Sequence, residues 1–175
     1  QIAASITLGS GHFCTNPGLV FLMTSGDATR FEKALTNLVI NSSPTLMLNK
    51  TDCNNYYNSK KALAGQNGIS ILAEASDLST ELKSAPALLK TTATDFIRNA
   101  ALQAEVFGPS SLIVWCKDRN ELLSALESLH GQLTGTVMGT AADLAAYNEI
   151  ITCLNSKAGR VLFNGVPTGV EVCHA

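Results

Sequence analysis

The residues best suited to covalent chemistry lie in a glycine-rich stretch near the start of the chain. Cys14 stands within Gly-Ser-Gly-His-Phe-Cys-Thr-Asn-Pro-Gly, residues 9–18. A thiolate is a good nucleophile, and glycines let the backbone come close to a substrate. Most free cysteines, however, are small buried apolar residues. The local pattern alone therefore leaves a nucleophilic and a structural interpretation of Cys14 open.

A second unusual stretch is Gln-Ala-Glu-Val-Phe-Gly-Pro, residues 103–109. The Gly-Pro pair ends the element that precedes it. Taken alone, Glu105 is typical of a solvated carboxylate and Phe107 of a core aromatic residue. A third stretch, residues 164–169, combines glycine, proline and asparagine in a loop that contains Val166 and Pro167.

Two competing functions remain open at this point. In a thiol hydrolase, His12, His130 or His174 would act as the base, which must lie within hydrogen-bond reach of the Cys14 sulfur. His130 is predicted at a helix end, where a cation interacts favourably with the helix dipole. In the other alternative, the chain is a non-catalytic α/β interaction domain.

Composition excludes several classes of protein. The 175 residues are 46% hydrophobic and 15% charged, with a net charge of -2, which predicts one globular domain. Nothing in this balance indicates binding to nucleic acid or to an anionic membrane. Apolar runs are too short to span a bilayer. The five cysteines form no CxxC pair, so we expect no metal site, no disulfide framework and a reducing compartment, the cytoplasm.

The elements that must position these residues follow from periodicity. A small-residue helical pattern containing Ile2, Ala3 and Ile6 precedes Cys14. Strands are predicted at residues 19–23, 69–75, 87–91, 110–116, 133–138 and 160–163. Helices are predicted at residues 27–41, 51–64, 92–98, 118–129 and 140–154, with Asp27, Thr92, Asp118 and Thr140 as capping residues.

Alternation of strands and helices from about residue 110 predicts an α/β fold with a largely parallel sheet covered by helices. In open sheets of this kind, ligands bind at loops beyond the carboxyl ends of strands. The loops after residues 116, 138 and 163 are therefore candidates for a ligand site. No GxGxxG or GxxxxGK[ST] phosphate-binding pattern is present.

Three blocks in this order resemble the catalytic domain of the aldehyde dehydrogenase superfamily. They are the Cys14 loop, the Glu105 motif 91 residues later (105 − 14 = 91), and residues 159–172. The last block is most similar to the branch of α-ketoglutarate semialdehyde (2,5-dioxovalerate) dehydrogenases and related NADP-linked enzymes. The resemblance implies a three-layer, open, mostly parallel sheet flanked by helices, and assigns residues 1–175 to the catalytic domain.

The resemblance also implies roles for named residues. Cys14 would attack an aldehyde to form a thiohemiacetal and then a thioester, with its own backbone N–H as an oxyanion donor. Glu105 would bind the nicotinamide ribose of NADP or NAD, and Phe107 would pack near the nicotinamide. Phe13, Val166 and Pro167 would line the substrate tunnel. The substrate would be a small aldehyde, with α-ketoglutarate semialdehyde favoured.

Other parts of the family's machinery would lie outside these residues. The general-base glutamate, the oxyanion-hole asparagine and the cofactor-binding domain precede the nucleophile in the family, and a C-terminal segment assists homo-oligomer formation as a dimer or tetramer. Gln1 begins in the middle of a helical pattern and Ala175 follows no polar tail. We therefore expect a fragment of a longer enzyme that is inactive alone.

Overall fold

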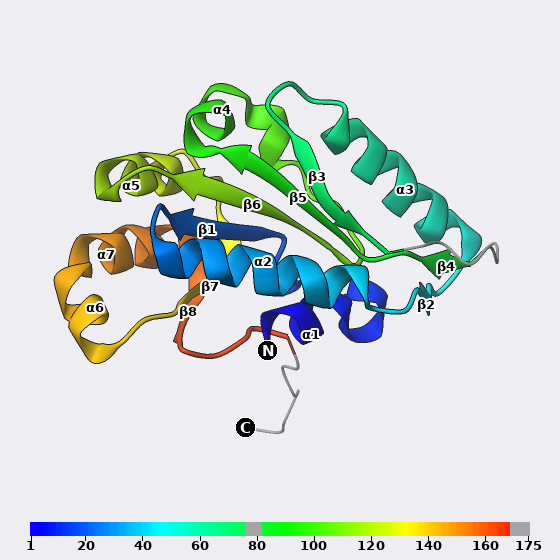
Figure 1. The fold of residues 1–175 in the computed structure, drawn as a ribbon, viewed down its shortest axis with the longest axis horizontal. Helices are drawn as coiled ribbons and strands as arrows, with labels where there is room; N and C mark the ends of the chain where they lie inside the picture. Colours follow the sequence, from blue (N-terminus) through cyan, green and yellow to red (C-terminus); the bar gives the residue numbers. More distant parts are fainter. Residues whose placement is uncertain (76–81, 169–175) are drawn as a thin grey trace.

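A four-stranded sheet separates two layers of helices (Figure 1). The computed structural model describes residues 1–75 and 82–168. The elements in the sheet are β1 (Leu19–Met23), β3 (Ser70–Glu74), β5 (Ala87–Thr92) and β6 (Ser110–Cys116). The helices around it are α1 (Ile2–Thr7), α2 (Gly26–Ile40), α3 (Lys50–Ala64), α4 (Ala93–Arg98), α5 (Arg119–Glu127), α6 (Ala141–Ala146) and α7 (Asn148–Lys157).

The strand order in this sheet is β1-β6-β5-β3. β6 runs parallel to both neighbours, with Leu19 opposite Leu112 and Ala87 opposite Ser110. β3 pairs antiparallel to β5 at the sheet edge. The predicted α/β class with a mostly parallel sheet is therefore confirmed. The apolar runs of residues 19–23 and 110–116 become strands with the bounds that the sequence predicted.

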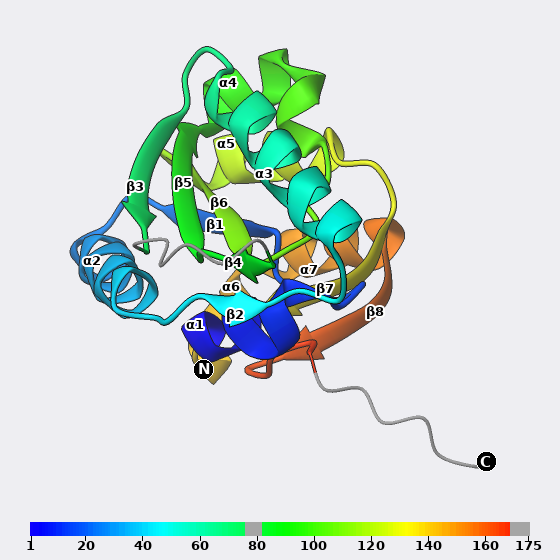
Figure 2. The same cartoon turned by 90° about the vertical axis from the view of Figure 1, so that its right-hand side faces the viewer.

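Alternation along the strands builds a separate core on each face. Leu112, Val114 and Cys116 of β6 point into one core, while Ile113 points into the other. Helices α3, α4, α5 and α7 contribute to the first core, and α1 and α2 to the second. Figure 2 shows the sheet between these two sets of helices. A strand that is buried on both faces carries a nearly continuous apolar run, as residues 112–116 of β6 do after Ser110 and Ser111.

Side-chain caps fix where the helices begin. Asp118 accepts a hydrogen bond from the Glu121 N–H and caps α5, as expected, and Thr140 and Asp143 form a complete capping box at α6. Asp27 was wrongly expected to cap α2. Ser25 is the capping residue, because its Oγ accepts from the Ala28 N–H at 3.0 Å, and Asp27 lies in the first turn.

Four parts of the chain depart from the predicted elements. Residues 140–154 form two helices, α6 and α7, because Tyr147 leaves helical geometry with φ −111° and ψ 34°. β7 (Gln132–Val137) and β8 (Ala158–Phe163) pair parallel in a small sheet of their own. Two short strands that the sequence did not indicate, β2 (Thr45–Leu46) and β4 (Lys83–Ser84), pair antiparallel. A 3-10 turn, η2, occupies Ala100–Gln103.

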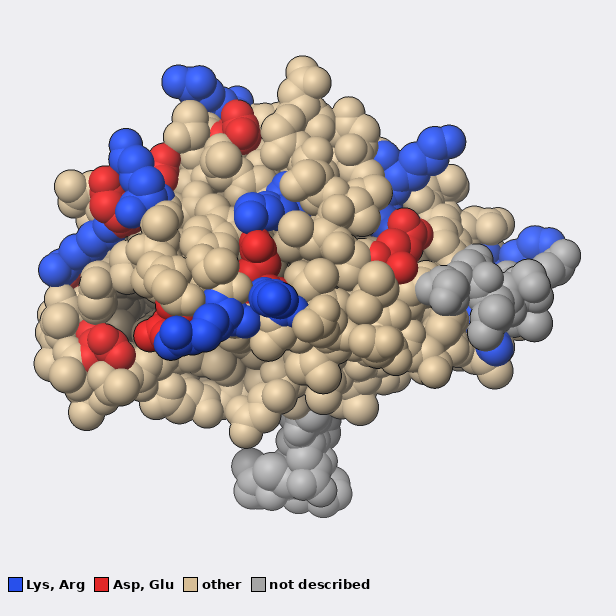
Figure 3. Space-filling view, viewed as in Figure 1, with Lys and Arg blue, Asp and Glu red and all other residues tan. Residues whose placement is uncertain are grey.

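Charge is distributed in both signs on the face drawn in Figure 3, where basic and acidic side chains are interspersed. Pairs such as Lys90 with Glu32 bring opposite charges together across α2 and β5. Within the part of the chain that the structure describes, no helix has the length and apolar character needed to cross a bilayer.

Candidate functional site

Cys14 lies on a turn that closes the loop before β1. The Asn16 N–H donates to the Phe13 carbonyl at 2.9 Å, so Cys14 and Thr15 are the two central residues of a four-residue turn. The Cys14 thiol is exposed. We call residues 8–18 the thiol loop. Its first part, the 3-10 turn η1 (Leu8–Gly11), has left-handed backbone at Gly9 and Ser10.

Glycine is required at position 11 because two backbone segments touch there. Gly11 has φ +68°, and a Cβ built on it would lie 2.2 Å from the carbonyl carbon of Gly108. No side chain fits this contact. The two sequence motifs, 91 residues apart (105 − 14), are therefore packed directly against each other in space.

The second motif, residues 105–109, is called the Glu105 turn. Glu105 is exposed, and Phe107 is 43% exposed, which is unusual for a large apolar ring. Two side chains of the thiol loop reach this turn. Asn16 Nδ2 donates to the Gly108 carbonyl at 2.8 Å, and the His12 ring stacks on Phe107 with centroids 5.5 Å apart and planes 27° apart.

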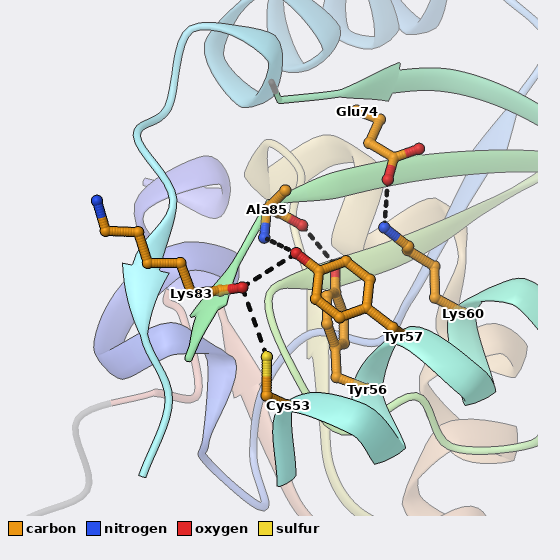
Figure 4. Close-up of polar contacts among 7 residues, drawn as sticks. All are labelled: Cys53, Tyr56, Tyr57, Lys60, Glu74, Lys83 and Ala85. Atoms are coloured by element: carbon orange, nitrogen blue, oxygen red, sulfur yellow. Dashed lines mark hydrogen bonds and ion pairs between the residues drawn. The ribbon is translucent and has the colours of Figure 1, made fainter. Parts of the chain in front are cut away.

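Tyr56 of α3 supports the other side of Gly108, and the sequence did not identify it. The Tyr56 ring is fully buried, and a Cβ on Gly108 would lie 2.2 Å from it. Its hydroxyl donates to the Ala85 carbonyl at 2.7 Å (Figure 4). Burial raises the pKa of Tyr56 well above its ordinary value, so the phenol stays protonated. The only signal in the sequence was the adjacent Tyr56-Tyr57 pair in a weak helical pattern.

Neighbouring contacts in Figure 4 hold α3 against the β4 strand. The Tyr57 hydroxyl donates to the Lys83 carbonyl at 3.0 Å and accepts from the Ala85 N–H at 3.2 Å. Lys60 pairs with Glu74 and lies 4.6 Å from the centre of the Tyr57 ring. These contacts fix α3 along its length, and with it the position of the Tyr56 ring behind Gly108.

The two motifs lie at the amino ends of β1 and β6. The loops expected from sheet topology, after residues 116, 138 and 163, lie at carboxyl ends, and the last of them contains Val166 and Pro167. The Leu112 N–H donates to the Gly18 carbonyl at 2.9 Å, and Ser111 Oγ donates to the Pro17 carbonyl. The thiol loop leads into β1 and the Glu105 turn leads into β6. Because the two strands are parallel neighbours, their entering segments meet at one edge.

Other thiols differ in environment from Cys14. Burial, with Glu121 and Asp118 nearby, raises the pKa of Cys116 to about 12. Burial also raises the pKa of Cys153. Cys53 is buried, with its sulfur 3.5 Å from the Lys83 carbonyl. Cys173 lies outside the described residues. Among the described cysteines, Cys14 alone is classed as exposed.

Residues predicted to line a substrate tunnel fall into two places. Phe13 lies within the Cys14 turn, and its ring fills the space beside Gly9. Pro167 is buried and Val166 is partly buried. Their segment is tied to α1 by a hydrogen bond between Thr168 Oγ1 and Ser5 Oγ. The contacts thus place Val166 and Pro167 on the α1 side, and residues 169–172 of the third block lie outside the described residues.

The described histidines make contacts other than a pair with Cys14. The His12 ring is stacked on Phe107, and the His130 N–H donates to Gln103 Oε1 at 3.1 Å in the segment after α5. His174 lies outside the described residues. Among residues 1–75 and 82–168, no group of His, Cys, Asp and Glu has an arrangement that could hold a metal ion.

Comparison with known proteins supports the resemblance drawn from the motifs. The chain is 40% identical over 171 residues to α-ketoglutaric semialdehyde dehydrogenase 2 of Azospirillum brasilense. It is 38% identical over 173 residues to α-ketoglutaric semialdehyde dehydrogenase of Acinetobacter baylyi. Each alignment includes 98% of this chain, which spans about a third (33%) of the length of these curated relatives. No protein-family model matches.

Solved structures share the fold at low identity. A succinic semialdehyde dehydrogenase from Streptococcus pyogenes, solved with NADP+, matches 97% of this chain and 38% of its own, with TM-score 0.77 and 16% identity. An aldehyde dehydrogenase from Bacillus cereus matches 96% of this chain and 35% of its own, with TM-score 0.75 and 18% identity. The predicted resemblance and fold are confirmed, while the roles of individual site residues stay predictions.

Proposed function

We propose that this chain is the nucleophile-bearing part of an NAD(P)-dependent aldehyde dehydrogenase, and that the whole enzyme oxidises α-ketoglutarate semialdehyde to the dicarboxylate. The observation that carries the proposal is the exposed Cys14 thiol on a turn packed directly against the Glu105 turn. The substrate follows from the names of the two relatives at 38–40% identity. Phe13, Val166 and Pro167 are proposed to line its tunnel.

Cys14 performs the covalent step. Its thiolate attacks the aldehyde carbon, a C–S bond forms, and the carbonyl oxygen becomes the oxyanion of a thiohemiacetal. The Cys14 N–H is the proposed donor to that oxyanion. After oxidation, water attacks the thioester, the C–S bond breaks, and the carboxylate leaves with the thiol restored. The exposed thiol and the turn that presents it supply access for both attacks.

The residues of the Glu105 turn fit a nicotinamide nucleotide. A bound NADP or NAD would accept the hydride from the thiohemiacetal carbon. Glu105 is an exposed carboxylate that can accept from two ribose hydroxyls, and Phe107 presents an apolar ring two residues away. The His12 ring behind Phe107 keeps that ring in place for this contact.

The isolated chain is proposed to lack dehydrogenase activity. Its relatives are about three times as long, which leaves room for a cofactor-binding domain, a general base and a segment for homo-oligomer formation. Cys14, Cys116 and Cys153 are free thiols, which supports the cytoplasm or another reducing compartment.

One experiment tests the function. The full-length polypeptide that the gene encodes is assayed for reduction of NADP+ and NAD+ with α-ketoglutarate semialdehyde, alongside Cys14→Ala and the matched control Cys153→Ala. We expect Cys14→Ala to lose turnover by at least about 10³-fold because the nucleophile is gone, and Cys153→Ala to keep it. Equal activity of Cys14→Ala and wild type would refute the proposal. Comparable turnover by residues 1–175 alone would refute the proposed inactivity of the isolated chain.

A further inference from the structure

The residues two before and two after Cys14 both reach across to the Glu105 turn. His12 stacks on Phe107, and Asn16 donates to the Gly108 carbonyl at 2.8 Å. Asn16 also closes the Cys14 turn, because its own N–H donates to the Phe13 carbonyl at 2.9 Å. Asn16, the last residue of the turn that presents the thiol, is thus also the residue that binds the Glu105 turn.

Stability alone does not explain these two side chains. His12 Nε2 and Asn16 Oδ1 are buried polar atoms without a hydrogen-bond partner among the described residues. An unpaired buried polar atom is unfavourable, and an apolar side chain of similar size avoids the penalty. Two such atoms flank one exposed thiol, so a role other than stabilising the fold accounts better for histidine and asparagine at these positions.

The Asn16 hydrogen bond is not the only one that the Gly108 carbonyl accepts. The Gly108 carbonyl accepts a second hydrogen bond, from the Ser110 N–H at 2.8 Å. Removing the Asn16 amide therefore leaves that carbonyl paired. What is lost is the link that joins the residue closing the Cys14 turn to the Glu105 turn, while the backbone contact between Gly11 and Gly108 remains.

We propose that Asn16 and His12 are positioning residues, which hold the Cys14 thiol at a fixed place relative to Phe107. Asn16 fixes the turn that carries the sulfur, and His12 fixes the ring beside it. This inference rests on the proposed dehydrogenase function and deepens it. In this inference, Asn16 and His12 align the aldehyde bound to Cys14 with the nicotinamide.

The test uses the full-length polypeptide and two measurements. Asn16→Ala and Asn16→Asp both remove the amide donor, and Asp keeps the volume. The matched control is Asn41→Ala, which removes an exposed Asn amide that donates to the Asn37 carbonyl at 2.7 Å at the end of α2. We expect kcat to fall about 100-fold in both Asn16 variants, with KM for NADP+ within about twofold of wild type, because misplaced reacting groups lose rate rather than binding.

Hydrogen exchange of residues 12–18 supplies a measurement that does not depend on turnover. The Asn16 and Gly18 N–H groups bond within the thiol loop, and we expect both Asn16 variants to exchange them at least about tenfold faster. Asn41→Ala should leave both kcat and exchange unchanged. Unchanged exchange in both Asn16 variants overturns the inference, whatever happens to turnover.

His12 has its own rescue experiment. His12→Ala removes the ring that stacks on Phe107, and we expect kcat to fall about tenfold, whereas His12→Phe keeps an aromatic ring and should restore most of it. Equal losses in the two variants overturn the role of the His12 ring. If wild type itself oxidises no aldehyde, the proposed function fails, while the exchange measurement still decides whether Asn16 positions the thiol loop.

Discussion

The parallel pair β1 and β6 has a cysteine near each of its two ends, in opposite environments. At the amino end, Cys14 is exposed on a turn beside glycines and a half-exposed Phe107. At the carboxyl end, Cys116 is the last residue of β6 and fully buried. Its carbonyl accepts from both the N–H and the hydroxyl of Thr24.

At the carboxyl end, two helices begin with their own side-chain caps. Ser25 caps α2 and Asp118 caps α5. Ser25 Oγ accepts from the Ala28 N–H and Asp118 Oδ1 accepts from the Glu121 N–H, so each cap pairs one of the N–H groups at its helix start. The comparison teaches that one strand pair can hold a thiol in opposite environments, exposed on a turn at its amino end and buried in the core at its carboxyl end.

The largest expected contrast between the two ends is thiol reactivity. At pH 8, well below the Cys116 pKa of about 12, the Cys116 thiol stays protonated. We expect iodoacetamide to label Cys14 in folded protein long before Cys116, as measured by mass spectrometry of peptides. Because the folded pKa of Cys116 is raised from 9.0, its contribution to stability should be present below pH 9 and decline as pH rises toward 12. Comparable labelling of both thiols at pH 8 would remove the contrast.

A substitution at the contact between Gly11 and Gly108 should disrupt the packing at the amino ends of β1 and β6. Gly11→Ala places a methyl group 2.2 Å from the Gly108 carbonyl carbon at φ +68°, and we expect a loss of roughly 3 kcal/mol in the free energy of unfolding. Gly18→Ala is the matched control, because nothing lies within 4 Å of its Cβ position. Its effect should stay within about 0.5 kcal/mol. Urea unfolding measures both, and equal values would contradict the close contact.

The smallest of the three effects concerns the caps at the carboxyl end. Asp118→Ala removes the cap of α5 and should lower the free energy of unfolding by about 1 kcal/mol. It should also lower the Cys116 pKa, which Asp118 helps to raise. Asp27→Ala, the control, removes an exposed side chain that pairs with Arg30 and should change little. A larger loss in Asp27→Ala would restore Asp27 as the cap of α2.

Much of the fold could be predicted because apolar runs were bounded by clear stop signals. Residues 19–23 follow Pro-Gly, and residues 110–116 follow Gly-Pro. The missed features have weak local signals. β2 and β4 are two-residue strands held by long-range pairing, and the break at Tyr147 keeps the apolar spacing of one continuous helix.

The candidate site could be predicted only in part. Each motif was visible as a sequence pattern, but their meeting depends on backbone contact between Gly11 and Gly108, and on the Tyr56 ring behind it. Neither contact produces a periodic pattern in the amino-acid sequence. The rule for carboxyl ends points to the loops after residues 116, 138 and 163, whereas the thiol loop and the Glu105 turn enter β1 and β6 at their amino ends.

The contact between Gly11 and Gly108 also sets an order of events on the ribosome. Cys14 is synthesised 94 residues before Gly108 (108 − 14 = 94). At about 5–20 residues per second, the thiol waits roughly 5–19 seconds for its counterpart to be made. A nascent chain that stalls within this interval carries the sulfur without the surface that holds it in place.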